Sequence, residues 1–348
     1  MSNNIYIYLI LFSTLYSCNN NHKEEFSIQV INESETTPLT SQLVIDEDLA
    51  QYYEIKIADS VVFLTTSRGE SAIKAFSTKD YSLIDEFGYK GDGPEGVDFP
   101  MFIKNTSNSG RVELYDINYK TLMKVDFNTE RNAHTIIKEQ MPDALWPSIN
   151  VNKVTNGIYF ANSLPPFNKG LFFKLNINTS EKEWIPFMPE YKTEEEDKTV
   201  IYRNIILINE DKAIVVCVMK YFNRIFIFDF NNNLVKDFQI GKTAIEPIVE
   251  DLKLDKFSKD SDKFFLNIVG NETYFYCLYN RDRINIDDRK GINSKIFVFD
   301  WNLNHVSTIQ TEHMISAFDV DPNNKYLLAL VFDEEEDTRV YKYDIEIP

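Results

Sequence analysis

The chain has 348 residues and carries 36 Lys and Arg against 54 Asp and Glu, a formal net charge of −18. A field of that sign repels nucleic acid and anionic lipid surfaces, which excludes a general affinity for either. With 19 Tyr, 26 Phe and only 11 Gly, the chain is rich in residues that favour β-strands.

The first 18 residues resemble a bacterial lipoprotein signal. The apolar run from Ile5 to Leu15 is shorter than the roughly twenty residues that cross a bilayer, but it fits the apolar part of a secretory signal. It ends in Leu15-Tyr-Ser-Cys18, which is similar to a lipobox, whose cysteine is lipidated and becomes the first residue of the mature protein. An ordinary signal peptide or an N-terminal core strand is the alternative.

This resemblance divides the chain into three parts. We predict a signal peptide at residues 1–18, a polar tether at 19–25 and one folded domain at 26–348. Lipidated Cys18 would then be the sole membrane contact. The residue after it, Asn19, fits sorting to the outer membrane, in a periplasmic or a surface-exposed orientation.

The folded domain contains a repeated series of predicted strands. Strand ends align at positions 77, 126, 176, 229, 300 and 344, and a period near fifty with strands inside each unit indicates a repeat protein. The predicted strands are 54–58, 61–66, 71–77 and 82–88; 101–105, 111–116, 121–127 and 133–138; 149–154, 157–163, 170–176 and 182–187; 200–208, 212–219, 222–230 and 234–241; 264–269, 272–279, 294–300 and 305–310; 315–320, 325–331 and 338–344.

Six such units predict an all-β fold, a six-bladed β-propeller with four-stranded antiparallel blades. Only three strands are visible in the last unit, so we expect one of two short N-terminal segments, 27–31 or 42–45, to pair with it and close the ring. No segment shows a sustained helical period. Cys217 and Cys277 each lie inside an apolar run and are predicted to be small buried hydrophobes rather than disulfide partners.

One segment carries a family resemblance. The run Phe87-Gly-Tyr-Lys-Gly-Asp-Gly-Pro-Glu-Gly-Val-Asp-Phe-Pro100, followed by Val112 to Asn118 and Leu122 to Val125, looks like an NHL-type propeller repeat over residues 87–128. The chain as a whole, lipobox included, is similar to the TolB-like six-bladed propeller lipoproteins of Gram-negative bacteria. That resemblance implies the fold and a location in the cell envelope, and it brings no established catalytic residues.

Loop lengths distinguish the two faces of such a ring. Strands of a blade run outwards from the channel, so first-to-second and third-to-fourth turns share one face, the turn face, and these are short. Second-to-third loops and blade-to-blade connections share the other face, which we call the crossover face. Its predicted loops are long: residues 89–99, 139–148, 188–199, 242–263, 280–293 and 332–337. Because binding residues concentrate on variable loops held by a rigid frame, we predict that the crossover face binds the ligand.

Three residues near predicted inner strands are candidates for ligand contact. Arg203 interrupts the predicted strand 200–208, and a charge beside the channel must be hydrated or paired. It therefore either contacts a ligand or forms a structural salt bridge. Trp146 and Tyr202 could form the aromatic walls of a pocket, with packing between blades as the alternative.

Two more arginines, Arg281 and Arg283, lie in a mixed-charge insertion. Their guanidinium groups either clamp an anionic group bidentately or pair with neighbouring carboxylates.

Asn150, Asn204 and Asp319 define an alternative function. Six-bladed lactonase-like enzymes coordinate calcium with such residues around the channel, so the alternative is a calcium-dependent hydrolase acting there. No Cys-x-x-Cys or Gly-x-Ser-x-Gly motif occurs in the chain, and we predict no catalytic residue and no cofactor.

The leading expectation is therefore a lipid-anchored, non-catalytic propeller. It would bind or scaffold an envelope protein, a peptide or a glycan through its crossover face, and nucleic acid is not an expected partner.

Overall fold

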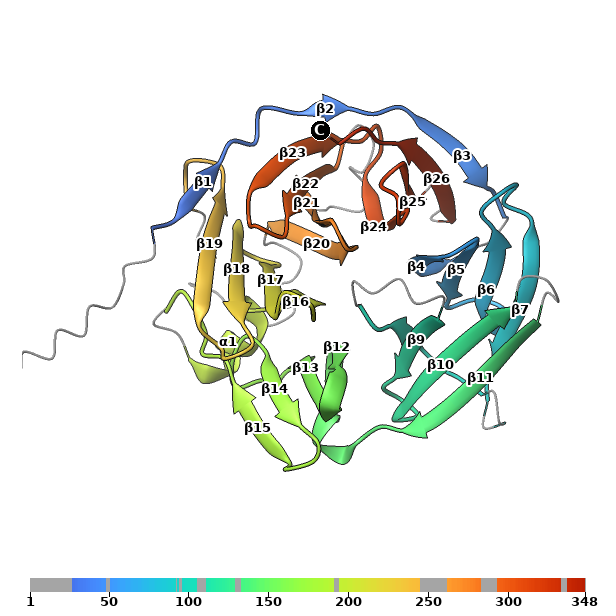
Figure 1. Ribbon diagram of the computed structural model, residues 1–348, viewed down its shortest axis with the longest axis horizontal. Helices are drawn as coiled ribbons and strands as arrows, with labels where there is room; N and C mark the ends of the chain where they lie inside the picture. The colour runs from blue at the N-terminus through green and yellow to red at the C-terminus, as the bar shows by residue number, and fades with distance from the viewer. Residues whose placement is uncertain are drawn as a thin grey trace, which may run out of the picture.

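Six sheets stand around a central channel like the blades of a propeller (Figure 1). This computed structural model describes residues 27–47, 51–91, 93, 96–104, 111–128, 133–190, 194–244, 262–282, 293–332 and 337–347. The predicted all-β, six-bladed fold is confirmed.

Each blade runs from an inner strand at the channel to an outer strand at the rim. Blade 1 consists of β4 (Tyr52–Ala58), β5 (Val61–Thr66), β6 (Ser71–Ser77) and β7 (Leu83–Tyr89). Blade 2 consists of β8 (Pro100–Phe102), β9 (Arg111–Asp116), β10 (Thr121–Asn128) and β11 (Ala133–Gln140). Blade 3 consists of β12 (Ser148–Val154), β13 (Ile158–Ser163), β14 (Phe173–Asn176) and β15 (Glu181–Trp184).

The remaining blades follow the same order. Blade 4 contains β16 (Asn204–Asn209), β17 (Ile214–Met219), β18 (Arg224–Asp229) and β19 (Leu234–Ile240). Blade 5 contains β20 (Lys263–Gly270), β21 (Tyr274–Asp282), β22 (Lys295–Asp300) and β23 (His305–Gln310). Blade 6 contains β24 (Ile315–Val320), β25 (Tyr326–Phe332) and β26 (Thr338–Asp344), completed by β3 (Ser41–Ile45).

The hydrophobic core is divided into six clusters, each of which fills the space between two neighbouring blades. Alternate residues of a strand point to opposite faces of its sheet, so one strand serves two clusters. In β17, Cys217 packs between blades 3 and 4, whereas Val216 and Val218 pack between blades 4 and 5. Burial on both sides explains the nearly continuous apolar runs of the sequence. Cys217 and Cys277 are both buried and free, as predicted.

The N-terminal segment closes the ring as predicted. β3 pairs antiparallel with β26 and supplies the fourth strand of blade 6. Two further pairings were not predicted: β1 (Gln29–Ile31) lies parallel to β19 of blade 4, and β2 (Thr37–Pro38) lies parallel to β23 of blade 5. Residues 27–45, which we call the strap, thus run around the outside of blades 4, 5 and 6 (Figure 1). The strap covers strand edges that would otherwise present unpaired backbone groups.

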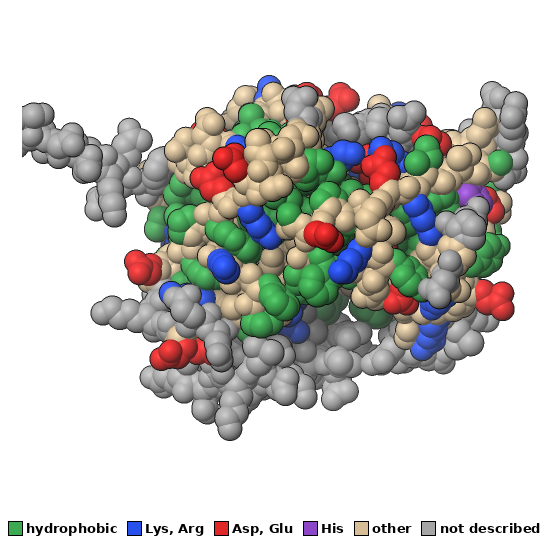
Figure 2. All heavy atoms as spheres, turned by 90° about the horizontal axis from the view of Figure 1, so that it is seen from below, with side chains coloured by type: hydrophobic (Ala, Val, Ile, Leu, Met, Phe, Trp, Pro, Cys, Tyr) green, Lys and Arg blue, Asp and Glu red, His purple; other side chains and the backbone are tan. Residues whose placement is uncertain are grey.

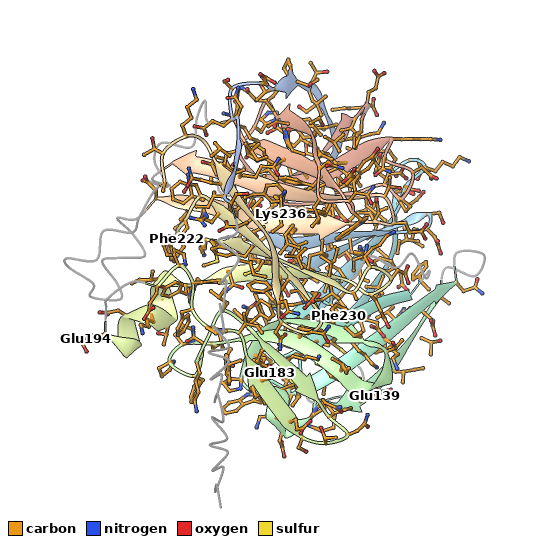
Figure 3. All side chains as sticks on the ribbon, turned by 60° about the vertical axis from the view of Figure 1, so that its left-hand side comes forward. Glu139, Glu183, Glu194, Phe222, Phe230 and Lys236 are labelled. Atoms are coloured by element: carbon orange, nitrogen blue, oxygen red, sulfur yellow. The ribbon has the colours of Figure 1, made fainter. Side chains whose placement is uncertain are left out.

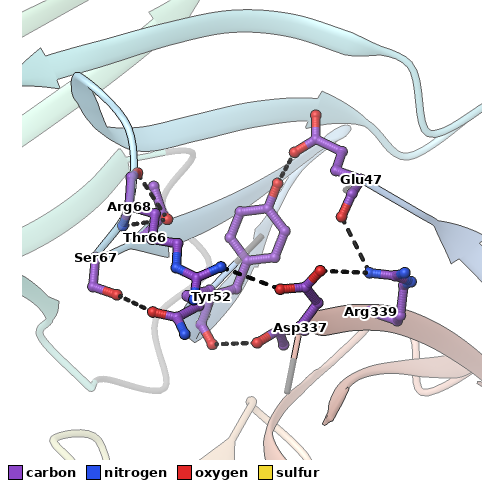
Figure 4. A network of polar contacts seen from close by, with 9 residues as sticks. Glu47, Tyr52, Thr66, Ser67, Arg68, Asp337 and Arg339 are labelled. Atoms are coloured by element: carbon purple, nitrogen blue, oxygen red, sulfur yellow. Dashed lines mark hydrogen bonds and ion pairs between the residues drawn. The ribbon is translucent and has the colours of Figure 1, made fainter. Parts of the chain in front are cut away.

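Polar contacts join blade 6 to blade 1 where the strap enters β4 (Figure 4). The Tyr52 hydroxyl donates to the Glu47 carboxylate. The Arg339 guanidinium donates to the Glu47 carbonyl oxygen over 3.2 Å. Asp337 pairs with Arg68 over 3.3 Å. These contacts add side-chain interactions between blade 1 and blade 6, the blade in which β3 and β26 close the ring.

One predicted strand begins too early. Residues 200–203 belong to the end of the short helix α1 (Glu195–Ile201) and the turn after it, and β16 starts only at Asn204. Val200, Ile201 and Tyr202 are buried in the cluster between blades 3 and 4. In the sequence, their apolar run therefore looks like an extension of the strand. No helix among the described residues is long and apolar enough to span a bilayer. Two single-turn 3₁₀ segments, η1 (Asp143–Leu145) and η2 (Thr155–Gly157), complete the elements.

Candidate functional site

The crossover face carries the long connections of the ring. Between blades these are residues 90–99, 141–147, 185–203 and 241–262, and within blade 3 the β13–β14 loop spans 164–172. Most connections of the turn face are shorter, such as 59–60, 155–157 and 210–213, and 103–110 is the exception. Most of the longer connections between the described strands therefore lie on one side of the ring.

All five exposed large aromatic side chains of the described chain lie on the crossover face. They are Tyr89, Phe99, Trp146, Phe167 and Phe332. Each sits in, or at the border of, a blade-to-blade connection or a second-to-third-strand loop. The exposed large aliphatic residues lie elsewhere, on the strap, on outer strands or on the turn face: Ile28, Val30, Leu43, Leu83, Ile137, Ile177 and Val235. Exposed aromatic area is therefore concentrated where the loops are long.

Trp146 and Phe167 form one aromatic pair on this face. Their ring centroids are 6.4 Å apart, and the side chains are 44% and 53% exposed. The Lys120 ammonium lies 4.4 Å from the Trp146 ring centroid, within cation–π range. Trp146 was predicted from the sequence as an aromatic wall, and the structure places it at the surface with a second aromatic neighbour.

Phe99 belongs to a connection that is tied down by hydrogen bonds. Its ring stacks on Tyr53 with centroids 4.3 Å apart and planes 9° from parallel. The buried Asp116 carboxylate accepts the backbone N–H groups of Asp98 and Phe99 at 2.7 and 3.1 Å. An exposed aromatic ring on a fixed backbone loses little conformational entropy on binding, which favours its use as an anchor.

Two cations, Arg203 and Lys220, meet at the crossover face beside blades 4 and 5. Arg203 follows α1, and Lys220 opens the β17–β18 loop. The Lys220 N–H donates to the Arg203 carbonyl over 2.8 Å, and the Lys220 carbonyl accepts the N–H of Phe264 over 2.8 Å. Figure 3 shows Glu194, beside α1, and Phe222, in the β17–β18 loop, at one end of blade 4. Phe230 lies toward the other end of the blade. The two cations are thus fixed by backbone contacts that span blades 4 and 5.

Among the described residues, the charges that act on Lys220 are positive. Burial lowers the pKa of Lys220 to about 8, and Arg203 and Lys263 act in the same direction. Burial raises the pKa of Tyr221, and the positive charge of Arg203 opposes this rise. Neither Arg203 nor Lys220 forms an ion pair with a carboxylate in the described part of the chain. The salt bridge considered as an alternative for Arg203 is not found there.

Tyr202 is buried, in contrast to Trp146. It is 1% exposed, and its ring lies 4.8 Å from Phe187 and 5.7 Å from Phe222 between centroids. Its hydroxyl donates to the Pro189 carbonyl oxygen. This placement corresponds to the packing alternative, since no surface of the ring is open to a ligand.

The central channel contains a cavity of about 30 Å³, enough for about two water molecules. Its polar lining comes from three innermost strands and from the segment after β8: Glu54, Lys56, Lys104, Asn267 and Asp319. The Lys56 ammonium pairs with the Asp319 carboxylate at 3.3 Å, and the same carboxylate accepts the N–H of Ile57 at 2.7 Å. The Lys104 ammonium donates to the side chain of Asn267. These contacts link blades 1, 2, 5 and 6 across the channel.

Burial dominates the protonation of the Glu54 and Lys104 pair. It raises the pKa of Glu54 to about 7, although Lys104 and the Phe102 N–H, 2.6 Å from the carboxylate, both favour the charged form. Burial also lowers the pKa of Lys104, against the attraction of Glu54 and Asp319. Desolvation disfavours a charge of either sign in a narrow channel, so Glu54 keeps its proton to higher pH than usual and Lys104 loses its proton at lower pH than usual.

The predicted calcium set is not assembled at one point. Asn150 and Asn204 are neighbours: the Asn150 amide donates to the Asn204 carbonyl oxygen at 3.5 Å. However, the Asn204 side-chain oxygen already accepts the amide of Asn162 at 2.7 Å. Asp319 belongs to blade 6 and is engaged by Lys56 and the Ile57 backbone. Within the described ranges no group of three or more His, Cys, Asp or Glu side chains is arranged to hold a metal ion. Calcium binding through this set stays a prediction.

Several predicted positions lie outside the described residues. The signal segment 1–18 with Cys18, the tether 19–25 and Arg283 fall in this group. The backbone of Arg281 belongs to β21.

Phe167, Lys220, Glu54 and Lys104 are among the polar and aromatic residues above that were not predicted from the sequence. Glu54 and Lys104 could have been found, since each is a charged residue in or beside an otherwise apolar inner strand. Lys220 and Phe167 carry no such signal, because a lysine or an aromatic residue in a loop is ordinary until the fold shows its neighbours.

Two solved structures with a similar fold come from Bacteroides species. A crystal structure from Bacteroides fragilis NCTC 9343, described as an exported protein, has 13% identity and a TM-score of 0.54, covering 92% of this chain and 100% of that one. A member of the DUF4221 family from Bacteroides vulgatus ATCC 8482 has 10% identity and a TM-score of 0.56, covering 89% and 99%. At these identities the likeness shows the fold alone. A comparison with curated proteins returned no match.

The sequence itself provides the family. A family profile described as TolB-like 6-blade propeller-like matches residues 32–323, which is most of the chain and includes five complete blades. The match agrees with the blade count and with the resemblance carried by residues 87–128. The chain belongs to the TolB-like six-bladed propeller family.

Proposed function

We propose that this protein is a lipid-anchored binding module of the cell envelope, which holds a partner protein or peptide on its crossover face. The observation that carries the proposal is the confinement of the exposed aromatic side chains to that face. Aromatic residues are enriched at the hot spots of protein interfaces, where they supply large apolar area at low entropic cost.

The spacing of the aromatic residues favours a protein over a glycan. They are distributed over the blade 1–2 and 2–3 connections, the β13–β14 loop and the end of β25. A sugar ring needs one open aromatic face with polar groups beside it. One face of Phe99 is covered by Tyr53, and Lys120 lies over Trp146. Separate anchors around a rim suit a larger partner surface better, and glycan binding becomes an outcome of the test.

The envelope location rests on the N-terminal segment. The lipobox-like end at Cys18 would leave the polar stretch 19–25 as a tether between an acylated cysteine and the strap. Two acyl chains anchor stably where one does not. The structurally similar protein from Bacteroides fragilis is described as exported, which supports the same compartment. We propose the outer membrane as the site of anchoring.

The proposal is tested by comparing matched variants in one capture experiment. Trp146→Ala with Phe167→Ala removes two aromatic anchors, whereas Leu83→Ala with Ile177→Ala removes two exposed aliphatic side chains of the turn face. We expect the wild type and the turn-face variant to retain one specific protein from envelope extract. The aromatic variant should lose it, and with the purified partner should bind about tenfold to 100-fold more weakly.

Equal retention by all three proteins would overturn the assignment of the face. Retention of polysaccharide in place of protein would show that the glycan alternative is correct.

A further inference from the structure

We infer that Arg203 and Lys220 form an oxyanion-binding site on the crossover face, which receives a carboxylate or phosphate group of the bound partner. This inference deepens the proposed function and rests on it for the biological ligand. The anion site itself is a property of the protein alone, and it is tested without a partner.

The first argument is the isolation of positive charge in an acidic protein. The chain carries a net charge of −18, and Figure 2 shows Lys and Arg interspersed with Asp and Glu on the side of the ring that it views. Several other cations of the described chain pair with carboxylates, as Lys56 does with Asp319 and Arg224 with Asp237. At Lys220 the acting charges are the cations Arg203 and Lys263. A cluster of like charges persists in a fold at a cost in stability, and a bound anion would offset that cost.

The second argument is geometric. The peptide N–H of Lys220 donates to the Arg203 carbonyl, and the Lys220 carbonyl accepts from Phe264. The backbones that carry both side chains are therefore fixed to each other and to blade 5. Tyr221 and Phe222, which follow Lys220, are buried, while Arg203 and Lys220 are half-buried. The two cationic side chains thus sit on an immobile base and remain accessible.

The third argument is the chemistry of the donors. A guanidinium group matches the two oxygens of a carboxylate or phosphate, and a lysine ammonium adds a compact point charge. Such a pair would recognise an acidic side chain or C-terminus of a protein partner, or a phosphate group. The aromatic side chains of the same face would supply apolar contact area around this charge.

Two probes separate the two sources of the anion. Inorganic phosphate represents the phosphate group, and the blocked dipeptide acetyl-Glu-Glu-amide represents a peptide carboxylate. Each is titrated by calorimetry and by thermal shift, at constant ionic strength maintained with chloride. The variants are Arg203→Gln, Lys220→Met and the control Lys212→Met, which removes a lysine from the turn face of the same blade.

We expect saturable binding of at least one probe to the wild type and to the Lys212 control. Binding should weaken by about tenfold or more in each of the other two variants, equivalent to about 1.4 kcal/mol or more. Preference for the dipeptide would identify a peptide carboxylate, and preference for phosphate would identify a phosphate group.

Absence of saturation with both probes, or equal binding by all four proteins, would overturn the inference. Circular dichroism of each variant verifies folding, and Arg203→Lys provides a second test because it keeps the charge while losing the bidentate geometry. The aromatic capture experiment is independent: if capture fails while phosphate still binds at Arg203 and Lys220, the proposed function falls and the anion site stands.

Discussion

The hydroxyl oxygen of Tyr115 accepts the backbone N–H of Asn150 at 2.8 Å, which couples the second strand of blade 2 to the inner strand of blade 3. Asn150 has a φ of 49° and lies where the β12–β13 register shifts between Ile149 and Asn152. Asparagine adopts this left-handed conformation more readily than other side chains except glycine. The fold therefore provides a conformational reason for an asparagine at this position.

This reason predicts how Asn150 variants behave. Asn150→Gly should stay within about 0.5 kcal/mol of the wild type in unfolding free energy, and Asn150→Ala should lose about 1 kcal/mol, because only alanine is strained at positive φ. Chemical denaturation with and without calcium measures both effects. A calcium-dependent rise in stability that both variants abolish would instead favour the calcium alternative.

Lys220 should destabilise the folded protein at neutral pH. Its pKa is about 8 when folded, against 10.5 for the ordinary side chain. The unfolded chain therefore binds this proton more tightly between these values, and stability rises as the pH increases from about 8 to about 10.5. Lys220→Met removes the penalty while keeping most of the aliphatic stem. We expect the free energy of unfolding of Lys220→Met at pH 7 to be about 1 to 3 kcal/mol higher than that of the wild type.

The difference between the two proteins should shrink above pH 8. Denaturation of both across this range measures it, with Lys212→Met as the control that shows no difference at any pH. A Lys220→Met protein less stable than the wild type at pH 7 would mean that the lysine has a stabilising partner.

Glu54 should stabilise the folded protein at low pH, whereas Lys220 lowers stability at neutral pH. Its pKa is raised from 4.5 to about 7 in the channel, so the folded protein holds the proton to higher pH than the unfolded chain does. The contribution of Glu54 is therefore fully present below about pH 4.5 and is lost as the pH rises through about 7. The expected loss is of the order of 1 to 3 kcal/mol. Glu54→Gln, which resembles the protonated form, should remove this part of the pH dependence.

The comparison is made as a difference between wild type and Glu54→Gln at pH 5 and pH 8, since other carboxylates titrate in both proteins. A constant difference across that interval would show that Glu54 ionises normally.

The pattern of strands in the sequence predicted most of the fold, for a physical reason. Each blade repeats the same two-sided burial, so the alternation of one unit supports that of the next, and β9, β23, β24 and β26 begin and end where the sequence predicts. The pairings of β1 and β2 were not predicted, because these strands are two or three residues long and pair in parallel with strands far away in the sequence. Local pattern has no information on such partners.

The candidate site was less predictable. Long loops indicated the correct face for Trp146, but burial of Tyr202 and the meeting of Arg203 with Lys220 depend on α1 and on the β17–β18 loop together. The Glu54 and Lys104 pair likewise joins strands of different blades. Contacts between separate repeats are set by the closed ring, and a single sequence does not show them.

The association of the protein with the membrane should depend on Cys18. If the N-terminal segment is a lipoprotein signal, Cys18→Ala prevents acylation, and the protein should move from the membrane fraction to the soluble fraction of the envelope. Immunoblotting of both fractions measures the distribution, with Cys217→Ala as a control because that thiol is buried in the propeller core. Unchanged fractionation of Cys18→Ala would refute the lipobox interpretation.

The strap should contribute measurably to stability through Ile31. This side chain is 4% exposed and packs with Phe238 and Ile240 in the cluster between blades 4 and 5. The Ile31 carbonyl accepts the N–H of Gly241 at 2.8 Å, which fixes β1 on the edge of β19. Ile31→Ala should lower the free energy of unfolding by about 2 to 4 kcal/mol, the usual cost of such a deletion in a packed core. The neighbouring Val30 is 48% exposed, so Val30→Ala should change the free energy of unfolding by less than about 0.5 kcal/mol.

Hydrogen exchange of the β19 amides measures whether the strap opens before the ring does. Equal effects of the two substitutions would mean that β1 detaches without disturbing the blades and covers the edge without stabilising it.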